Sequence, residues 1–285
     1  MRNKLITMLA LGWALFNSLT IYGQTENYKK GLAAIQANRY HEAMICFTKV
    51  VTDEKFEITG KDLSMGYAYL AVIRTAYLEK GLQGGDFASI TLNQGQIQQA
   101  LSEMTRAVKF QDNASKSLLK NARPTLEEIS LKALYVVGDS LLEFNENQPN
   151  ESSSYLADIA VKLFSDLDQL ISDNWKFYDT MGLAYYHLGD KENAMGSFQK
   201  AREAFAKLEE QPVSQLHLRN YILSGNYFFK EKNNMKVAYQ ISNEGSSYTS
   251  ALINQLDDSQ MSDILKLNKI ENRFRQYMTR IEEAE

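Results

Sequence analysis

The chain has 285 residues, of which 44% are apolar and 23% are charged, and its formal net charge at pH 7 is -4. A chain of this length and apolar content can bury a sizeable core, and its three prolines and lack of a low-complexity tract exclude a largely disordered protein. Positive and negative residues are interspersed, which excludes both the basic stripe of a nucleic-acid-binding protein and an acidic tail.

The first 24 residues have the order of a secretion signal. Arg2 and Lys4 form a positively charged start, residues 5–16 are uncharged and mildly apolar, and residues 17–23 are more polar. An apolar run this short cannot cross a bilayer core of roughly 30 Å at about 1.5 Å per residue. We expect cleavage near Gly23 or Gln24, which leaves a periplasmic or secreted protein without an integral membrane segment. An uncleaved N-terminal anchor is the alternative.

From Thr25 onward the sequence repeats one helical pattern. A small residue lies on the apolar face of each predicted first helix, at Gly31, Gly66, Gly138, Gly182 and Gly225. After the first four, a second helix is predicted by apolar residues that recur on one face; after the fifth, this stripe is degenerate. Small residues where two helices approach, and large ones where space must be filled, predict that the helices pack in pairs.

The pattern is clearest from Trp175 to Lys207, where Leu188-Gly189-Asp190 predicts a tight turn between two helices. The residues that set the packing of this pair are Tyr178, Gly182, Tyr185, Ala194 and Phe198. This arrangement resembles the tetratricopeptide repeat, in which aromatic residues, Gly, Tyr, Ala and Phe recur at fixed spacing. The resemblance implies an all-α solenoid of stacked antiparallel helix pairs, with about five units, some of them degenerate.

Most spacings between units exceed the roughly 34 residues of this family, so we expect insertions at 81–93 and 145–154. The turn residues in these stretches predict helices that begin near Lys61, Gln94 and Pro124, and another that begins near Ser152 or Ser154. A short extra helix is expected at 115–121.

The last segment keeps an apolar stripe from Met261 to Ile281, with charged residues on the other face. Such a segment predicts the cap that a repeat stack needs where it ends in water. A dimerising coiled coil is the alternative. The predicted organisation is a signal peptide at 1–24, a repeat domain at 25–245 and C-terminal capping helices at 246–285.

The sequence contains no motif that indicates catalysis, a metal or a cofactor. His41, His187 and His217 are isolated from one another and from any acidic or cysteine cluster at metal-ligand spacing. Neither a P-loop nor a Gly-x-Ser-x-Gly elbow is present. We expect His41 and His187 to be solvated or to cap helices, and Cys46, the sole cysteine, to be a small apolar residue in a helix interface.

The resemblance also implies a concave groove lined by the first helices. Transferred position by position, its partner-binding residues are Tyr28, Tyr67, Tyr135, Asp139, Asp179, Leu183, Tyr186, Asn226 and Phe229. Apolar and aromatic groups dominate this set, which is typical of protein-binding surfaces. The alternative is that inserted segments or the C-terminal helix cover the groove. Capture of a terminal carboxylate in this groove is disfavoured, because only Asn226 fits the Lys, Arg and Asn residues that such binding uses.

These expectations favour a non-enzymatic scaffold of the cell envelope that holds a peptide or a helix of another protein. The alternative is a structural subunit of an envelope complex, for secretion or outer-membrane assembly. A ligand carrier or an enzyme is disfavoured, since no polar groups converge in the sequence pattern and a fold by itself does not imply catalysis.

Overall fold

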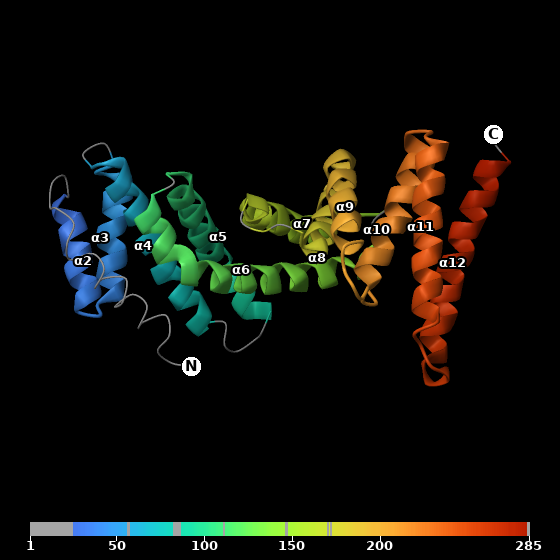
Figure 1. The fold of residues 1–285 in the computed structure, drawn as a ribbon, viewed down its shortest axis with the longest axis horizontal. Coiled ribbons are helices and arrows are strands. Elements are labelled where there is room, and N and C mark those ends of the chain that lie inside the picture. The colour runs from blue at the N-terminus through green and yellow to red at the C-terminus, as the bar shows by residue number, and fades with distance from the viewer. Residues whose placement is uncertain are drawn as a thin grey trace. The chain divides into compact units, whose positions relative to one another are not determined.

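The structure is a computed structural model that describes residues 25–55, 58–81, 87–110, 112–145, 148–169, 171 and 173–283. Every regular element within these ranges is a helix (Figure 1), which confirms the predicted all-α fold of packed helix pairs. Two compact units are formed, Met1–Val136 with Ile159–Ser172 and Val137–Asp158 with Asp173–Glu285. The signal peptide expected at 1–24 lies outside the described residues, and no described helix is long and apolar enough to cross a membrane.

The first unit begins with α2 (Glu26–Gln36) and α3 (Tyr40–Thr52), which are joined by a tight turn. Phe47 of α3 is fully buried and lies over Gly31 of α2, so closely that a Cβ at Gly31 would be 2.9 Å from the ring. The other face of Phe47 is covered by Tyr69, whose ring centre is 4.7 Å away. This ring therefore fills the space that the glycine leaves, as the sequence pattern predicted.

Tyr69 belongs to α4 (Gly60–Gly81), which is followed by α5 (Phe87–Lys109). Residues 64–75 of α4 are buried on all sides, because the helix packs against both α3 and α5. Gly66 approaches Val50 and Val51 of α3, where the sequence pattern predicted contact with the helix that follows. The stripe expected on α5, consisting of Ala100, Met104 and Ala107, is fully buried.

Several predicted helix limits are wrong. Helix α5 begins at Phe87, so residues 87–93, expected to be an inserted loop, are helical. Helix α6 (Asn113–Leu141) is continuous, includes the segment 115–121, and passes through Pro124, where the sequence predicted a start. Ala122 and Leu126 on either side of this proline are buried, so packing outweighs the backbone hydrogen bond that a proline removes.

Helix α7 (Glu151–Phe164) begins earlier than either predicted start. Its first turn is capped by Asn150, whose Oδ1 accepts a hydrogen bond of 2.9 Å from the backbone N–H of Ser153. The residues expected on its buried stripe, Ala160, Phe164 and Leu167, are fully buried, the last of them in the 3₁₀ turn η2 (Ser165–Gln169).

The second unit contains α8 (Trp175–His187) and α9 (Lys191–Phe205), the pair that the sequence predicted most clearly. Asn174 and Asp190 cap the two helices through their side chains, and Gly189 adopts the positive φ of 79° that the connecting turn requires. Gly182 lies directly against Phe198, since a Cβ at Gly182 would be 2.5 Å from the ring.

The unit continues with α10 (Gln215–Asn226), a π-helical turn η3 (Tyr227–Glu231), α11 (Met235–Ile253), a short 3₁₀ turn η4 (Asp258–Gln260) and α12 (Met261–Glu282). Helices α11 and α12 lie side by side (Figure 1). The contact between a glycine and a phenylalanine ring recurs here, because a Cβ at Gly245 of α11 would be 2.6 Å from the ring of Phe274 of α12. The boundary expected between residues 245 and 246 falls inside α11, so the segment that follows the last repeat helix is η4 and α12 alone.

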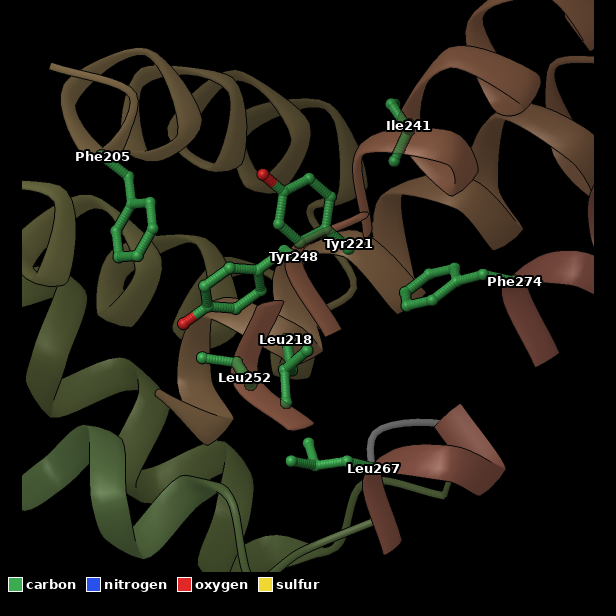
Figure 2. Packing of buried hydrophobic residues seen from close by; sticks show 8 residues of the cluster. All are labelled: Phe205, Leu218, Tyr221, Ile241, Tyr248, Leu252, Leu267 and Phe274. Carbon is green, nitrogen blue, oxygen red and sulfur yellow. The ribbon is translucent and has the colours of Figure 1, made fainter. Parts of the chain in front are cut away.

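Two other predicted glycines pack differently. Gly138 of α6 approaches Thr180 of α8, not the stripe of α7, and a Cβ at Gly225 would lie 3.4 Å from the hydroxyl oxygen of Ser242. The second unit is instead held by a larger core, which Figure 2 shows. Its buried members are Phe205, Leu218, Tyr221, Ile241, Tyr248, Leu252, Leu267 and Phe274.

The contact between Gly182 and Phe198 predicts the effect of adding a side chain there. Gly182→Leu should lower the free energy of unfolding by about 1 to 3 kcal/mol, because the buried ring must move to admit it. Gly196→Leu is the matched control, since nothing lies within 4 Å of a Cβ at that helical position, and it should be neutral or stabilising by up to about 1 kcal/mol. Urea unfolding of both variants measures the difference, and equal midpoints would mean that the helices do not meet at Gly182.

We expect the chain to lose solubility when α12 is removed. Deleting residues 258–285 uncovers the face of α11 around Gly245 and leaves the core without Leu267 and Phe274. The truncated chain should aggregate, because an apolar face then meets water. Gln276→Ala, at an exposed position of α12, should change nothing. A truncated protein that is monodisperse by size-exclusion chromatography and melts as the full chain does would contradict the capping role.

Candidate functional site: a groove between α9 and α11

The nine side chains expected to line a concave groove have very different environments. Tyr28, Tyr67, Asp179, Leu183 and Tyr186 are buried. Tyr135, Asn226 and Phe229 are half-buried, and Asp139 is exposed. The five buried side chains therefore face the interior of the chain and not an open groove.

The cause is that neighbouring helices of the same chain cover these positions. Tyr28 packs edge-on against Phe47, with 5.6 Å between ring centres, and Arg106 lies over the ring of Tyr67. Helix α10 packs on α8, which carries Asp179, Leu183 and Tyr186. Phe229 contacts Tyr277 of α12 at 6.0 Å between ring centres. The C-terminal helix, one of the two covers that the sequence left open, is thus found at Phe229, whereas helices α3, α5 and α10 lie against Tyr28, Tyr67 and α8.

Burial of Asp179 creates a polar network in the core of the second unit. Its carboxylate accepts hydrogen bonds of 2.7 Å from Nδ1 of His217 and 2.7 Å from Nδ2 of Asn220. All three residues are fully buried. Because a carboxylate can only accept, the hydrogen of the imidazole is placed on Nδ1. Asn220 also donates to the backbone carbonyl of Phe198, which ties α10 to both α8 and α9.

His217 is held by aromatic side chains. Its ring stacks on Phe205 at 3.9 Å between centres, and the rings of Trp175, Tyr221 and Tyr248 meet it edge-on. Within the described part of the chain, Nε2 of His217 has no hydrogen-bond partner. The imidazole thus serves as a packed ring with one polar anchor. In the same ranges no group of His, Cys, Asp or Glu residues could hold a metal ion.

His187 also differs from expectation. It is buried, although the sequence predicted a solvated or capping role, because its helix α8 is covered by its neighbours. His41 is exposed, in agreement with the prediction for that residue.

Arg202 of α9 carries the network toward the surface. Its Nη1 donates to Oδ1 of Asn220 at 2.5 Å and to the hydroxyl of Ser224 at 3.0 Å. The guanidinium lies over the ring of Tyr221, 5.9 Å from its centre. Burial lowers the pKa of Arg202, while Tyr221 and the carboxylates of Glu244, Asp179 and Glu203 act in the opposite direction.

Beside Arg202 the surface is hollowed by a cavity of about 640 Å³, which we call the α9–α11 groove. Helices α9 and α11 form its walls. Tyr221 of α10 and Phe228 of η3 also line it. Its lining residues are Met195, Gly196, Gln199, Arg202, Glu203, Ala206, Tyr221, Phe228, Val237, Gln240, Ile241 and Glu244. The volume lies within the range of roughly 300 to 1,000 Å³ that is usual for binding pockets.

The groove combines apolar and polar surfaces in a regular way. Phe228 and Val237, both half-buried, supply apolar surface. On each wall a glutamine donates to a glutamate one helical turn later, Gln199 to Glu203 at 2.8 Å and Gln240 to Glu244 at 2.9 Å. Glu203 is exposed and Glu244 is half-buried, so polar groups line the groove beside the apolar ones.

Gly196 is unusual in this wall. It lies inside α9, where a glycine lowers helix stability by about 1 kcal/mol relative to alanine. No atom lies within 4 Å of the place that a Cβ would take, so packing within the chain does not require a glycine there. A glycine at such a position leaves room for another backbone to come close to the helix. The free chain does not use that room.

Sequence reasoning placed Asp179 correctly on α8 but missed its partners and the groove. Arg202 follows Phe198 by four residues, so it adjoins the apolar stripe of α9, and a charge at that position was a usable signal. Gly196 lies off the stripe and was a second signal. The contacts of His217 and Asn220 with Asp179 join residues far apart in the chain, which the local pattern does not reveal.

The buried network predicts that two aspartates of the second unit respond differently to the same change. Asp179→Asn places an amide donor opposite the donors of His217 and Asn220, and should lower the free energy of unfolding by about 1 to 3 kcal/mol. Asp139→Asn is the matched control at an exposed site, where a change within about 0.5 kcal/mol is expected. Urea midpoints measure both, and equal effects would contradict the network.

Comparison with known proteins gives a family resemblance for part of the chain. Residues 27–52 and 176–207 match the family model of the tetratricopeptide repeat. A search of curated proteins found no match. The two matched segments coincide with α2/α3 and α8/α9, in which Phe47 lies against Gly31 and Phe198 against Gly182. In sequence and in packing, these two helix pairs are similar to tetratricopeptide repeats, units that stack into scaffolds for protein interaction.

Proposed function

We propose that this chain is a non-enzymatic scaffold of the cell envelope that holds a segment of another protein in the α9–α11 groove. The observation that carries the proposal is the groove itself, a hollow lined by apolar and polar side chains between two helices of a repeat-like unit. This combination is common where proteins bind a helix or an extended peptide.

The dimensions of the groove suit a protein segment. Its lining on α9 runs from Met195 to Ala206, which at 1.5 Å per residue is a length of roughly 16 Å. About five residues of extended chain, or three turns of helix, have this length. The segment can therefore contact both walls while its ends continue beyond the groove.

The polar residues of the unit support a binding role over catalysis. Asp179 and His217 are fully buried and are not among the groove-lining residues. Their hydrogen bonds and aromatic contacts position α10, and through it Asn220 and Arg202. They act as structural supports of the groove.

The proposal retains part of the surface expected from the sequence. Asn226, the last residue of α10, and Phe229 of η3 are half-buried, so each keeps some surface for a partner. The envelope location rests on the charged start and short apolar run of residues 1–24.

A blocked groove tests this function. The protein is immobilised and exposed to envelope extract, and the captured proteins are identified. Gly196→Trp should abolish capture, because the side chain fills the groove at a position where no atom of the free chain lies within 4 Å. Gly95→Trp is the matched control, since Gly95 is an exposed glycine of helix α5 whose missing Cβ also has no neighbour within 4 Å.

Loss of the same proteins from the Gly196→Trp sample, with retention by wild type and Gly95→Trp, supports the proposal. Identical capture by all three proteins would place binding elsewhere. A partner held in stoichiometric amounts through salt washing would favour the alternative of a structural subunit.

A further inference from the structure

Arg202 has binding capacity that the free chain leaves unused. Both hydrogen bonds of its guanidinium are made by Nη1, and both acceptors, Asn220 and Ser224, are neutral. Among the residues that the structure describes, none brings a carboxylate within ion-pair distance of Arg202. Its Nε and Nη2 thus make no hydrogen bond within the described ranges, and Arg202 is one of the residues that line the groove.

Arg74 in the first unit shows how this chain satisfies a buried arginine, whereas Arg202 is half-buried. Its Nε donates to both carboxylate oxygens of Glu103, at 3.0 and 2.9 Å, and its Nη1 donates to Gln96 at 3.0 Å. Arginines are rarely buried without such an anionic partner. By this comparison, the site of Arg202 lacks the carboxylate.

The acidic groups nearby do not fill that role. Asp179 is engaged by His217 and Asn220. Glu203 and Glu244 accept hydrogen bonds from glutamines of their own helices. An additional carboxylate at Nε and Nη2 would form the two parallel hydrogen bonds that suit a guanidinium.

We propose, building on the scaffold function above, that the segment held in the α9–α11 groove carries an aspartate or glutamate side chain that pairs with Arg202, flanked by apolar side chains. The charge of Arg202 and the apolar surface of Phe228 and Val237, which are half-buried, define these two requirements. Gly196 admits the backbone of the segment close to α9.

The position of Arg202 favours a side chain of a passing segment over a chain terminus. On α9 the groove extends about 10 Å before Arg202, to Met195, and about 6 Å beyond it, to Ala206. A segment whose carboxylate reaches Arg202 thus has groove surface on both sides. A terminal carboxylate would leave one of these sides uncovered.

Selection from a random peptide library tests the proposal. Peptides of twelve residues are displayed inside a loop, without free ends, and are selected on the wild-type protein and counter-selected on Gly196→Trp. The enriched peptides should share one acidic residue between apolar ones. For a synthetic peptide from this set, Glu→Gln or Asp→Asn in the peptide should weaken binding at least tenfold, as measured by calorimetry.

Variants of the protein identify the contact. Arg202→Gln should weaken binding of the acidic peptide at least tenfold. It should not weaken binding of the amide counterpart of that peptide any further, since the change in the protein and the change in the peptide remove the same interaction. Lys200→Gln is the matched control, because Lys200 is an exposed cation of α9 that does not line the groove, and it should leave binding unchanged. Melting curves check folding; if Arg202→Gln is unfolded, Arg202→Lys, which keeps the charge and loses the paired geometry, replaces it and should weaken binding several-fold.

The outcomes separate this inference from the scaffold function. Groove-dependent peptides that are basic or lack an acidic residue would overturn the inference and leave the scaffold function standing. So would binding that ignores the peptide carboxylate, or that ignores Arg202→Gln in a folded protein. If the library yields no peptide that Gly196→Trp blocks, the inference also fails, while capture from envelope extract judges the scaffold function independently.

Discussion

The contact on which much of this structure depends is that of a phenylalanine ring with a glycine of a neighbouring helix. It occurs between Gly31 and Phe47, between Gly182 and Phe198, and between Gly245 and Phe274. In each case the missing Cβ lets a large ring sit against the backbone of the partner helix, so that the two helices approach closely without leaving a void. Because each such pair contacts its neighbours mainly through its remaining faces, stacking further helices extends the core.

In the second unit, helix α10 is held against its neighbours by hydrogen-bonded polar side chains, and not by a phenylalanine ring against a glycine. Asp179, His217 and Asn220 fix α10 against α8 and α9, and Arg202 joins this buried network to the groove wall. A polar network that is satisfied in the interior specifies one arrangement of helices. In this chain the same arrangement opens the α9–α11 groove and holds the charged group beside it, which links the packing of the unit to its proposed binding role.

The sequence was sufficient where packing is local and repeated. The α8/α9 pair, its capped turn and the contact of Gly182 with Phe198 follow from residues within about 30 positions, and they were predicted. It failed at Pro124, because packing of α6 outweighed a local helix-breaking signal. It also failed for Tyr186 and Asp179, since their burial is decided by helices that the repeat pattern does not position. The groove depends on such contacts as well, so in the sequence only the charge of Arg202 beside the apolar stripe and Gly196 off that stripe could have indicated it.

Site-specific photo-crosslinking most directly tests the claim that a partner segment lies in the α9–α11 groove. A photoreactive residue is placed at position 240, on the groove wall of α11, and separately at position 236, which is exposed one turn earlier on the same helix and does not line the groove. The account predicts a crosslinked partner from position 240 in envelope extract and none from position 236. Equal crosslinking from both positions, or crosslinking from 236 alone, would contradict it.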